Sequence, residues 1–416
     1  MSPSIWVVNH YANPSALPGN TRHFELARRL EERGWDVTLI ASSFHHGSRT
    51  LLRPGIRKPS AELVDGVRFV WIPSRCGYVG NDISRVANMT EFAWRVWRSG
   101  WSSFDRNAPR PDVVVGSSPH LLAPLVAWRL ARRFGAPLVL EVRDLWPETL
   151  VALGAFGRYH PTVIGLQMLE RFLYRHADRI ISLLPEAWRY IEGPGVPRGK
   201  IDWIPNGATI PPEIPHPLAG PVDGPFTVMY AGAHGRANML DDLLSAAAVA
   251  QVNGAEMRFV LIGDGPEKER LIKRAEHESL TNVEFRTAVP KTVMPAILAE
   301  ADAVVALLED TPLYRYGISL NKLFDYMAAG KPIVLAGNVA HNYIEIAQCG
   351  LTVPPRDPEG LVGALVKLAE MSSDARREMG LRGRAYVEVH HDWDLLADRL
   401  ADVLDEVVAG PRSGAR

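Results

Sequence analysis

Residues 316–334 read YGISLNKLFDYMAAGKPIV and predict a tight turn, a short helix over residues 320–329 and a buried strand. Ser319 is expected to cap the helix by accepting a backbone hydrogen bond, and Gly330 to end it in the left-handed conformation. Four apolar side chains follow the i, i+3, i+4, i+7 spacing of a helix face that packs into a core, namely Leu320, Leu323, Phe324 and Met327.

The open face of this helix then carries Asn321, Lys322 and Asp325. Lys322 lies in the first turn, where the helix dipole disfavours a cation, so an anion bound at the same helix end by backbone amides would explain it. Asp325 lies one turn further on and can accept two hydrogen bonds from a diol. A phosphate near a lysine and a diol near a carboxylate describe a nucleoside diphosphate, so the segment predicts a nucleotide site.

The length and composition of the chain indicate two globular domains. The 416 residues suffice for two domains of roughly 200 residues each. The net charge of −1 argues against a general nucleic-acid binder. Only two cysteines occur, Cys76 and Cys349, which argues against a disulfide framework. The sequence shows neither a signal peptide nor a run of about 18 apolar residues. We therefore expect a cytoplasmic protein whose membrane contact, if it has one, is peripheral and at the inner face.

Apolar runs alternate with helical patterns along both halves of the chain, which indicates an open, doubly wound sheet in each. The first half predicts strands over residues 5–8, 37–41, 67–72, 113–116, 138–142 and 179–184, with the clearest helix over residues 21–33. The second half predicts strands over residues 227–231, 258–262, 283–285, 303–307 and 332–335, and helices over residues 240–252, 267–277, 293–298 and 320–329.

Seven prolines lie between residues 205 and 225 and mark a semi-rigid linker. We therefore predict an N-terminal domain over residues 1–210, a linker over residues 211–225 and a C-terminal domain over residues 226–390. Residues 393–408 form a final helix by their period.

The loop over residues 9–23 follows the first strand, at the sheet edge where open α/β sheets bind ligands. Gly19 would let the backbone approach a ligand closely, and Asn20 follows it. The alternative is an ordinary loop in which Asn20 caps the next helix. His10 lies in the same loop and is a candidate ligand-binding residue.

Residues 141–148, EVRDLWPE, place four ionisable groups at the end of a buried strand. Such groups are costly to place there unless they meet water, each other or a ligand. We expect Arg143, Asp144 and Glu148 to face a ligand at this edge of the sheet. The alternative is that Arg143 and Asp144 form a structural ion pair.

Residues 91–104 carry tryptophans at helical spacing, Trp94, Trp97 and Trp101, with Arg95 and Arg98 beside them. Tryptophan and arginine together are typical of a membrane interface. The alternative is that the tryptophans pack into the core of the first domain.

These motifs resemble the retaining GT-B glycosyltransferases of family 4 over essentially the whole chain. That family's donor signature has two acidic residues separated by seven others, followed by an apolar stretch and Gly-Lys-Pro. Asp325 holds the second acidic position, whereas Gly317 stands at the first. The sequence RDLWPE over residues 143–148 resembles a bacterial subgroup that builds surface polysaccharides, including amino-sugar transferases of O-antigen assembly.

The resemblance also implies how the donor is bound. Relatives carry an arginine and a lysine where this chain has Ala233 and Asn238, which leaves Arg236 and Lys322 as cations for the diphosphate. Arg236 would otherwise be a solvated loop residue. The turn over residues 263–266 resembles the turn beneath the nucleotide. The remaining donor contacts are expected from the loop over residues 9–23 and from backbone groups of the second domain, namely Gly19, Asn20, Val289, Gly317, Ile318, Ser319 and Leu320.

The fold implied is GT-B: two Rossmann-like domains facing a cleft, with the donor mostly on the second domain, the acceptor mostly on the first and the last helix crossing back to the first. The implied activity is metal-independent transfer, with retention, of a hexosyl or N-acetylhexosaminyl group. A UDP-sugar is favoured as donor and a glycan or lipid-linked saccharide as acceptor. Arg143 and Asp144 would act at the reacting sugar, and both would be catalytic together with Lys322. The acceptor, which can be lipid-linked, would be bound by His10, Trp94, Trp97 and Glu148. Two other functions stay open, a GT-B nucleotide-sugar epimerase and a non-catalytic sugar- or nucleotide-binding scaffold.

Overall fold

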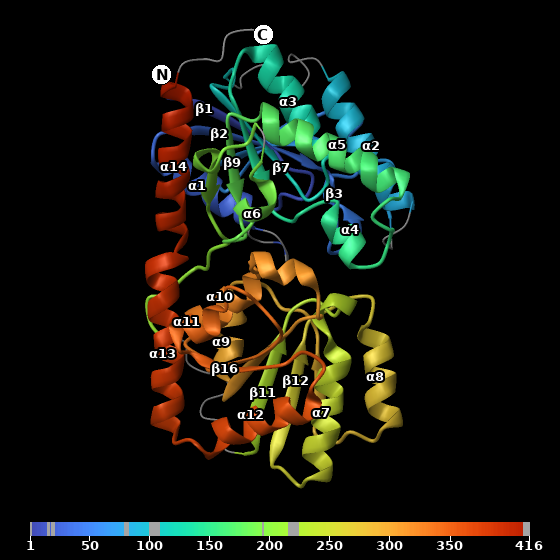
Figure 1. The fold of residues 1–416 in the computed structure, drawn as a ribbon, viewed down its shortest axis with the longest axis vertical. Helices are drawn as coiled ribbons and strands as arrows, with labels where there is room; N and C mark the ends of the chain where they lie inside the picture. The colour runs from blue at the N-terminus through green and yellow to red at the C-terminus, as the bar shows by residue number, and fades with distance from the viewer. Residues whose placement is uncertain are drawn as a thin grey trace. The chain divides into compact units, whose positions relative to one another are not determined.

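The computed structural model describes residues 2–14, 17, 21–78, 83–99, 109–193, 195–214 and 224–410. The chain folds into two compact units (Figure 1). Unit 1 comprises Met1–Pro205 and Trp393–Arg416, and unit 2 comprises Asn206–Asp392. Four predicted features lie outside the described residues, namely Gly19, Asn20, Trp101 and residues 215–223 of the linker.

Unit 1 is built on a sheet with the strand order β10-β9-β8-β7-β1-β2-β6-β5. Its strands are parallel except β5, which pairs antiparallel with β6. The strand bounds are Ser4–Val8 for β1, Asp36–Ser42 for β2, Ser60–Val64 for β5, Val67–Ile72 for β6, Val113–Ser117 for β7, Leu138–Val142 for β8, Arg179–Ser182 for β9 and Ile201–Trp203 for β10. A separate antiparallel pair is formed by β3 (Phe44–His45) and β4 (Thr50–Leu51).

Helices connect these strands and pack on the sheet. Their bounds are Arg22–Glu32 for α1, Ile83–Arg98 for α2, Leu122–Phe134 for α3, Glu148–Ala152 for α4, Pro161–His176 for α5, Trp188–Ile191 for α6 and Trp393–Ala409 for α14. The last helix, α14, packs against α1 and buries Trp393 and Leu396 in the same core as the strands. The helix at the C-terminal end of the chain is therefore part of unit 1.

Unit 2 has an all-parallel sheet with the order β13-β12-β11-β14-β15-β16. The strand bounds are Phe226–Ala231 for β11, Met257–Ile262 for β12, Val283–Arg286 for β13, Ala303–Leu307 for β14, Ile333–Ala336 for β15 and Gly350–Val353 for β16. The helices are Leu240–Val252 for α7, Lys268–His277 for α8, Met294–Ala299 for α9, Asn321–Ala328 for α10, Tyr343–Ala347 for α11, Pro358–Glu370 for α12 and Ser373–His390 for α13.

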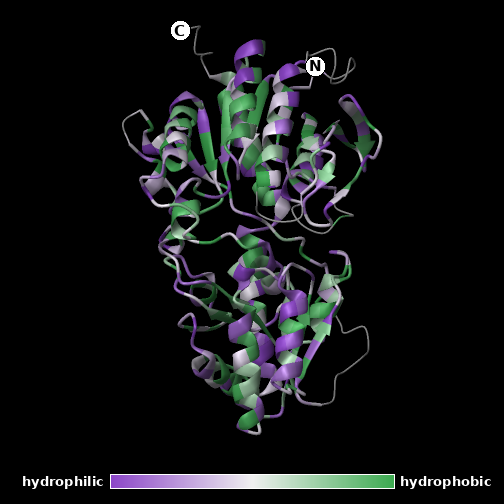
Figure 2. Cartoon of the chain, turned by 90° about the vertical axis from the view of Figure 1, so that its right-hand side faces the viewer, coloured by the Kyte–Doolittle hydropathy of each residue, from purple (hydrophilic) through white to green (hydrophobic). Residues whose placement is uncertain are grey.

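Both sheets wind outward in two directions from an early central strand, β1 in unit 1 and β11 in unit 2. The strand order therefore reverses between β1 and β7 and between β11 and β14, and open α/β sheets bind ligands beyond the carboxyl ends of strands at such points. Figure 2 shows the strands as largely hydrophobic and the helices as mixed. None of the helices in the described residues is long and apolar enough to cross a membrane.

Candidate functional site

Two glycine-containing turns form the floor of the switch point in unit 2. The first follows β11 over residues 232–235, and the second follows β12 over residues 263–266. The backbone amide of His234 donates to the carbonyl of Asp264 at 2.8 Å. A Cβ at Gly263 would lie 1.9 Å from the carbonyl oxygen of Gly232, so the turns can approach this closely only because residue 263 is glycine.

Helix α10 faces this floor as the sequence predicts. Leu323, Phe324 and Met327 are fully buried, whereas Lys322 and Asp325 lie half-buried on the open face. The predicted burial is therefore confirmed for these three residues, whereas Leu320, the N-cap residue, is only half-buried. The left-handed conformation predicted at Gly330 is also confirmed, with φ at 66°.

The predicted cap of α10 is wrong. Leu320 is the N-cap residue, and no side chain caps this helix. The hydroxyl of Ser319 instead accepts a hydrogen bond from the backbone amide of Asn206 at 3.0 Å, and the carbonyl of Ser319 accepts one from the Asn206 Nδ2 at 2.7 Å. The carbonyl of Asn206 in turn lies 2.9 Å from the His391 Nδ1. The hydroxyl of Ser319 is thus used in a contact with a residue distant in sequence and not in the helix cap that the local pattern predicted.

Lys322 is held by neutral groups. Its Nζ donates to the Tyr230 hydroxyl at 3.0 Å and to the Asn238 Oδ1, and it lies 4.6 Å from the centre of the Tyr230 ring. Burial lowers the pKa of Lys322 from 10.5 to about 7. Asn238 also donates a hydrogen bond to the carbonyl of Ala233 at 2.9 Å. Asn238, which stands where relatives carry a lysine, therefore positions the ammonium of Lys322. Sequence reasoning missed this role because the two residues lie far apart along the chain.

The loop that precedes α10 leaves three amides free. Gly317 has φ 90° and ψ −176°, a backbone conformation that is essentially restricted to glycine. An acidic residue at this position would therefore strain the backbone in this conformation. The amide of Gly317 donates to the carbonyl of Tyr314 at 3.0 Å. The amides of Ile318, Ser319 and Leu320 make no hydrogen bond within the described part of the chain.

Asp325 has a basic neighbour that the sequence did not reveal. The Nζ of Lys291 lies 3.5 Å from the Asp325 Oδ1. Burial raises the pKa of Asp325, and Lys291 opposes that shift. Lys291 follows the loop after β13 that contains Val289, which is half-buried. The structure thus brings the predicted base-contacting loop and the predicted ribose-binding carboxylate together.

Arg236 lies further out than Lys322. It begins a 3-10 turn, Arg236–Asn238, and its side chain is 92% exposed. The Nε lies 3.5 Å from the Glu267 Oε1. An exposed, long side chain of this kind can reorient at low cost, but in this structure the guanidinium is solvated.

In unit 1 the ionisable groups at the end of β8 belong to two different environments. Glu141 is buried, and it accepts hydrogen bonds from the Arg22 Nε at 2.9 Å and from the Ser117 Oγ at 2.7 Å, with the His23 Nε2 at 2.8 Å. Although burial raises the pKa of Glu141, Arg22 and His23 hold it well below its usual value. This network fixes the start of α1 to β8, and its partners lie too far away in sequence to be predicted.

The ionisable side chains that follow Glu141 form fewer hydrogen bonds than Glu141 does. The buried Nε of Arg143 has no hydrogen-bond partner in the described residues, and Asp144 is exposed. Arg143 and Asp144 form no close ion pair among the residues that the structure describes, but their charges still attract each other: burial raises the pKa of Asp144, and Arg143 opposes that shift. Glu148 begins α4 and pairs with Arg158 at 2.9 Å.

His10 is buried between aromatic rings. Its Nδ1 lies 2.8 Å from the His120 Nε2, and its ring stacks on Tyr11 at 4.5 Å and on Phe92 at 4.7 Å. Burial lowers the pKa of His10 well below 6.5 and that of His120 to about 3. Both imidazoles are therefore neutral at physiological pH.

Trp94 and Trp97 lie on α2 and are 54% and 42% exposed. The alternative that they pack into the core is therefore wrong. The guanidinium of Arg129, on α3, lies 4.0 Å from the centre of the Trp97 ring. Both tryptophans thus lie at the surface of unit 1, and Arg129 covers one face of the Trp97 ring.

Comparison with known families and proteins agrees with this architecture. Residues 19–207 match the family model of the glycosyl transferase 4-like domain, and residues 225–371 match that of glycosyl transferases group 1. A protein of Pseudomonas aeruginosa described as a glycosyltransferase, WbjE, is 27% identical over 64% of this chain and 68% of its own. WcaI of Escherichia coli, described as a colanic acid biosynthesis glycosyl transferase, is 22% identical over 62% of this chain and 66% of its own. The chain thus spans about two thirds of the length of these relatives.

Solved structures extend the likeness over nearly the whole chain. Sucrose-phosphate synthase from Thermosynechococcus elongatus superimposes with a TM-score of 0.73 at 18% identity, covering 98% of this chain and 99% of that one. HepE from Anabaena, in complex with UDP-glucose, gives a TM-score of 0.65 at 14% identity, covering 97% and 99%. At these identities the likeness shows the fold. With two Rossmann-like units that match the two family models in order, the chain belongs to the glycosyltransferases of the GT-B fold.

Proposed function

We propose that this chain transfers a sugar from a UDP-sugar, with retention, to a glycan or lipid-linked acceptor in the synthesis of a cell-surface polysaccharide. The observation that supports this proposal is the start of α10. There, a lysine held only by neutral groups lies in the same turn as three free amides. Cations and free amides at a helix start form an anion site. We assign the donor diphosphate to Lys322 and to the amides of residues 318–320.

The reaction needs the leaving diphosphate to be stabilised as negative charge develops on it. The pKa of Lys322 near 7 rises once a phosphate is bound, because the anion favours the charged ammonium. Asp325 accepts hydrogen bonds from the ribose hydroxyls while it keeps its ion pair with Lys291. Arg236 reorients from solvent onto the diphosphate.

Retention follows from a front-face path. The bond between the anomeric carbon and the UDP oxygen breaks while the acceptor oxygen bonds to the same face, and the departing phosphate takes the acceptor proton. Arg143 and Asp144 act on the sugar or acceptor from unit 1. His10, Trp94, Trp97 and Glu148 contribute to the acceptor side, with peripheral membrane contact where the acceptor is lipid-linked. No metal is required, and an excess of EDTA is expected to leave the rate unchanged.

The relatives support different parts of this proposal. WcaI is named for colanic acid biosynthesis, and HepE is described with UDP-glucose. A mycobacterial relative, 31% identical over 37% of this chain and 40% of its own, is described as a GDP-mannose-dependent mannosyltransferase. GDP-sugars are therefore the main competing donors.

The test is a thermal-shift screen of UDP-, GDP-, ADP- and dTDP-sugars on wild-type protein and on Lys322→Met. A ligand at 100 times its Kd stabilises the folded state by about 2.7 kcal/mol. We expect the largest shift with a UDP-sugar and its loss in Lys322→Met, while Lys367→Met, an exposed lysine on α12, behaves as wild type. If none of the four donors shifts the wild type, the proposal is wrong.

A second assay separates the transferase from the epimerase. The enzyme is incubated with the donor that gave the largest shift, with and without saccharide acceptors, and the products are analysed by NMR. Transfer with retention requires that the product keep the anomeric configuration of the donor. Formation of a new nucleotide-sugar isomer without an acceptor would instead show epimerase activity.

A further inference from the structure

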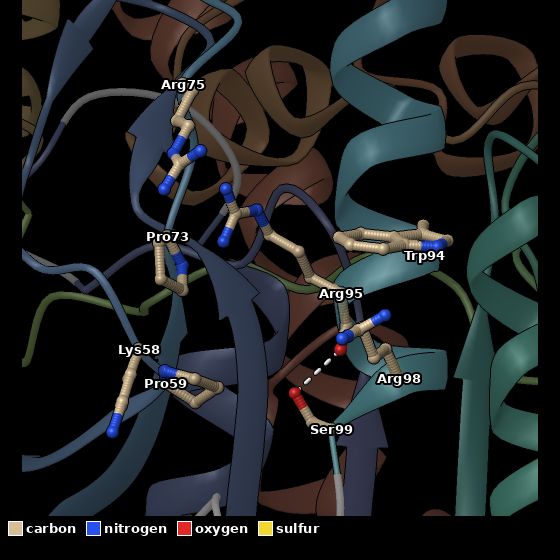
Figure 3. Close-up of a pocket in the computed structure, with 8 residues that line it drawn as sticks. All are labelled: Lys58, Pro59, Pro73, Arg75, Trp94, Arg95, Arg98 and Ser99. Atoms are coloured by element: carbon tan, nitrogen blue, oxygen red, sulfur yellow. Dashed lines mark hydrogen bonds between the residues drawn. The ribbon is translucent and has the colours of Figure 1, made fainter.

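A pocket of about 390 Å³ on unit 1 is lined by eight residues, of which four are basic (Figure 3). Trp94, Arg95 and Arg98 reach it from the last turns of α2. Lys58 precedes β5, and Arg75 follows β6. No acidic side chain is among its lining residues. The pocket lies on unit 1, whereas the proposed diphosphate site at the start of α10 is part of unit 2.

The charges in this pocket are mostly uncompensated. Arg95 pairs with Glu91 at 2.8 Å. Glu91 is further occupied by the backbone amides of Arg75 at 2.9 Å and Cys76 at 3.1 Å. The side chains of Lys58, Arg75 and Arg98 form no ion pair with any described residue. Three cations around one hollow repel each other, and a bound anion would relieve that repulsion.

Trp94 gives the pocket an apolar wall next to its charges. The guanidinium of Arg98 lies 5.3 Å from the centre of the Trp94 ring, and the ring is about half exposed. Ile83, at the opposite end of α2 from the pocket, is 86% exposed. Exposed tryptophan and apolar side chains beside arginines are typical of a surface that lies in the headgroup region of a bilayer.

The same charge pattern continues over the neighbouring helices. Helix α3 lies beside α2 and α5 and contacts both (Figure 1). The three helices carry two glutamates, Glu91, which is ion-paired, and Glu170, which is buried. They also carry eight arginines, Arg85, Arg95, Arg98, Arg129, Arg132, Arg133, Arg171 and Arg175. This excess is local, because the whole chain has a net charge of −1.

We propose that the pocket formed by Lys58, Arg75, Trp94 and Arg98 binds the phosphate group of an anionic membrane lipid. The phosphate lies among the three cations, while Trp94 and the exposed apolar residues of α2 enter the headgroup region. This surface gives the peripheral membrane contact of the proposed function a defined site. A soluble phosphate ester carries the same anionic group, so the experiment compares the two sources.

The experiment measures sedimentation of the full chain with vesicles in the presence of saturating UDP, so that the donor site is filled. The vesicles are pure phosphatidylcholine, or phosphatidylcholine with 20% phosphatidic acid. The test variant is Lys58→Gln/Arg98→Gln. The matched control is Lys367→Gln/Arg377→Gln, which removes the same charge from exposed positions on α12 and α13 of unit 2.

A basic residue near an anionic membrane contributes about 1 kcal/mol, or about a fivefold change in binding. We expect wild type and control to bind phosphatidic acid vesicles, and the test variant to bind about 30-fold more weakly. Trp94→Ala should weaken binding while leaving the salt dependence unchanged. Equal binding of test and control variants would overturn the proposal, as would equal binding to both kinds of vesicle.

Inorganic pyrophosphate, titrated by calorimetry with UDP present, distinguishes the sources. Weak or absent binding supports a lipid phosphate. Binding as tight as that of the vesicles, and lost in the test variant, would show an anion site for soluble phosphates and overturn the lipid assignment. Binding of UDP is measured on the same samples, so a failure of the donor-site proposal is recognised separately.

Discussion

The protonation of Lys322 should control the affinity for the donor diphosphate. Its pKa of about 7 means that half of the protein carries the charged ammonium at pH 7, and about 1% carries it at pH 9. Only the charged form attracts the diphosphate strongly. The association constant for UDP should therefore fall about 50-fold between pH 7 and pH 9, or by ~2.3 kcal/mol at 1.36 kcal/mol per tenfold change.

Isothermal titration calorimetry of UDP between pH 6 and pH 9 measures this effect. Lys322→Met keeps the length of the side chain and removes the charge, so the pH dependence should disappear in this variant. At pH 6, where the wild-type lysine is charged, the variant should bind UDP with ~1.5–3 kcal/mol less free energy, the usual contribution of a hydrogen bond to a charged group. Titration of UDP itself affects both proteins equally and cancels in their ratio.

The comparison can refute the assignment directly. If wild type and Lys322→Met show parallel pH profiles, Lys322 does not meet the diphosphate. Lys367→Met controls for the loss of one positive charge at a distance. If this variant also loses the pH dependence, the effect is one of net charge and not of a contact.

Three further predictions concern other parts of the chain. Gly317→Glu places a side chain at φ 90° and should cost about 1–3 kcal/mol in urea unfolding without improving UDP binding, whereas restored binding would show that the missing acid can act there. Glu170 is buried between the hydroxyls of Tyr174 and Tyr190, and burial raises its pKa to about 7. Because the folded-state pKa lies above the unfolded value, this group's stability contribution is complete below about pH 4.5 and is lost as pH rises to 7; Glu170→Gln should remove up to about 3 kcal/mol of that pH dependence, and unchanged unfolding curves would contradict the assignment. Arg22→Met should destabilise unit 1 by about 3–5 kcal/mol, since it leaves Glu141 buried without its main partner, and a loss below 1 kcal/mol would show that the network adapts.

The sequence was sufficient for most of the fold because buried parallel strands are continuous apolar runs. It did not predict β5, whose residues are partly or fully exposed and so lack that signal. It also did not predict β16, which begins with glycine and is only half-buried. Turn and helix positions around α10 were predictable because local spacing determines them.

The site itself was predictable only where its contacts are local. The open face of α10 follows from helical periodicity, which needs only eight neighbouring residues. The partners of Lys322 lie 92 and 84 residues away, and the Arg22 that holds Glu141 lies 119 residues away. Ser319 was assigned to the wrong partner for the same reason, since Asn206 reaches it across 113 residues. Periodicity cannot report contacts at such separations.

The position of Asn206 has a mechanical consequence. The chain enters unit 2 at this residue and leaves it at Asp392. Asn206 is bonded to Ser319 on one side and to His391 on the other, and His391 stacks on Phe324 of α10 at 3.9 Å. The two crossings, where the chain passes between the units at Asn206 and at Asp392, are thus connected by hydrogen bonds and ring stacking to the segment that presents the free amides. A ligand that stiffens those amides also restricts the torsions of the crossings, and by reciprocity a change in the crossings alters the affinity of the amides.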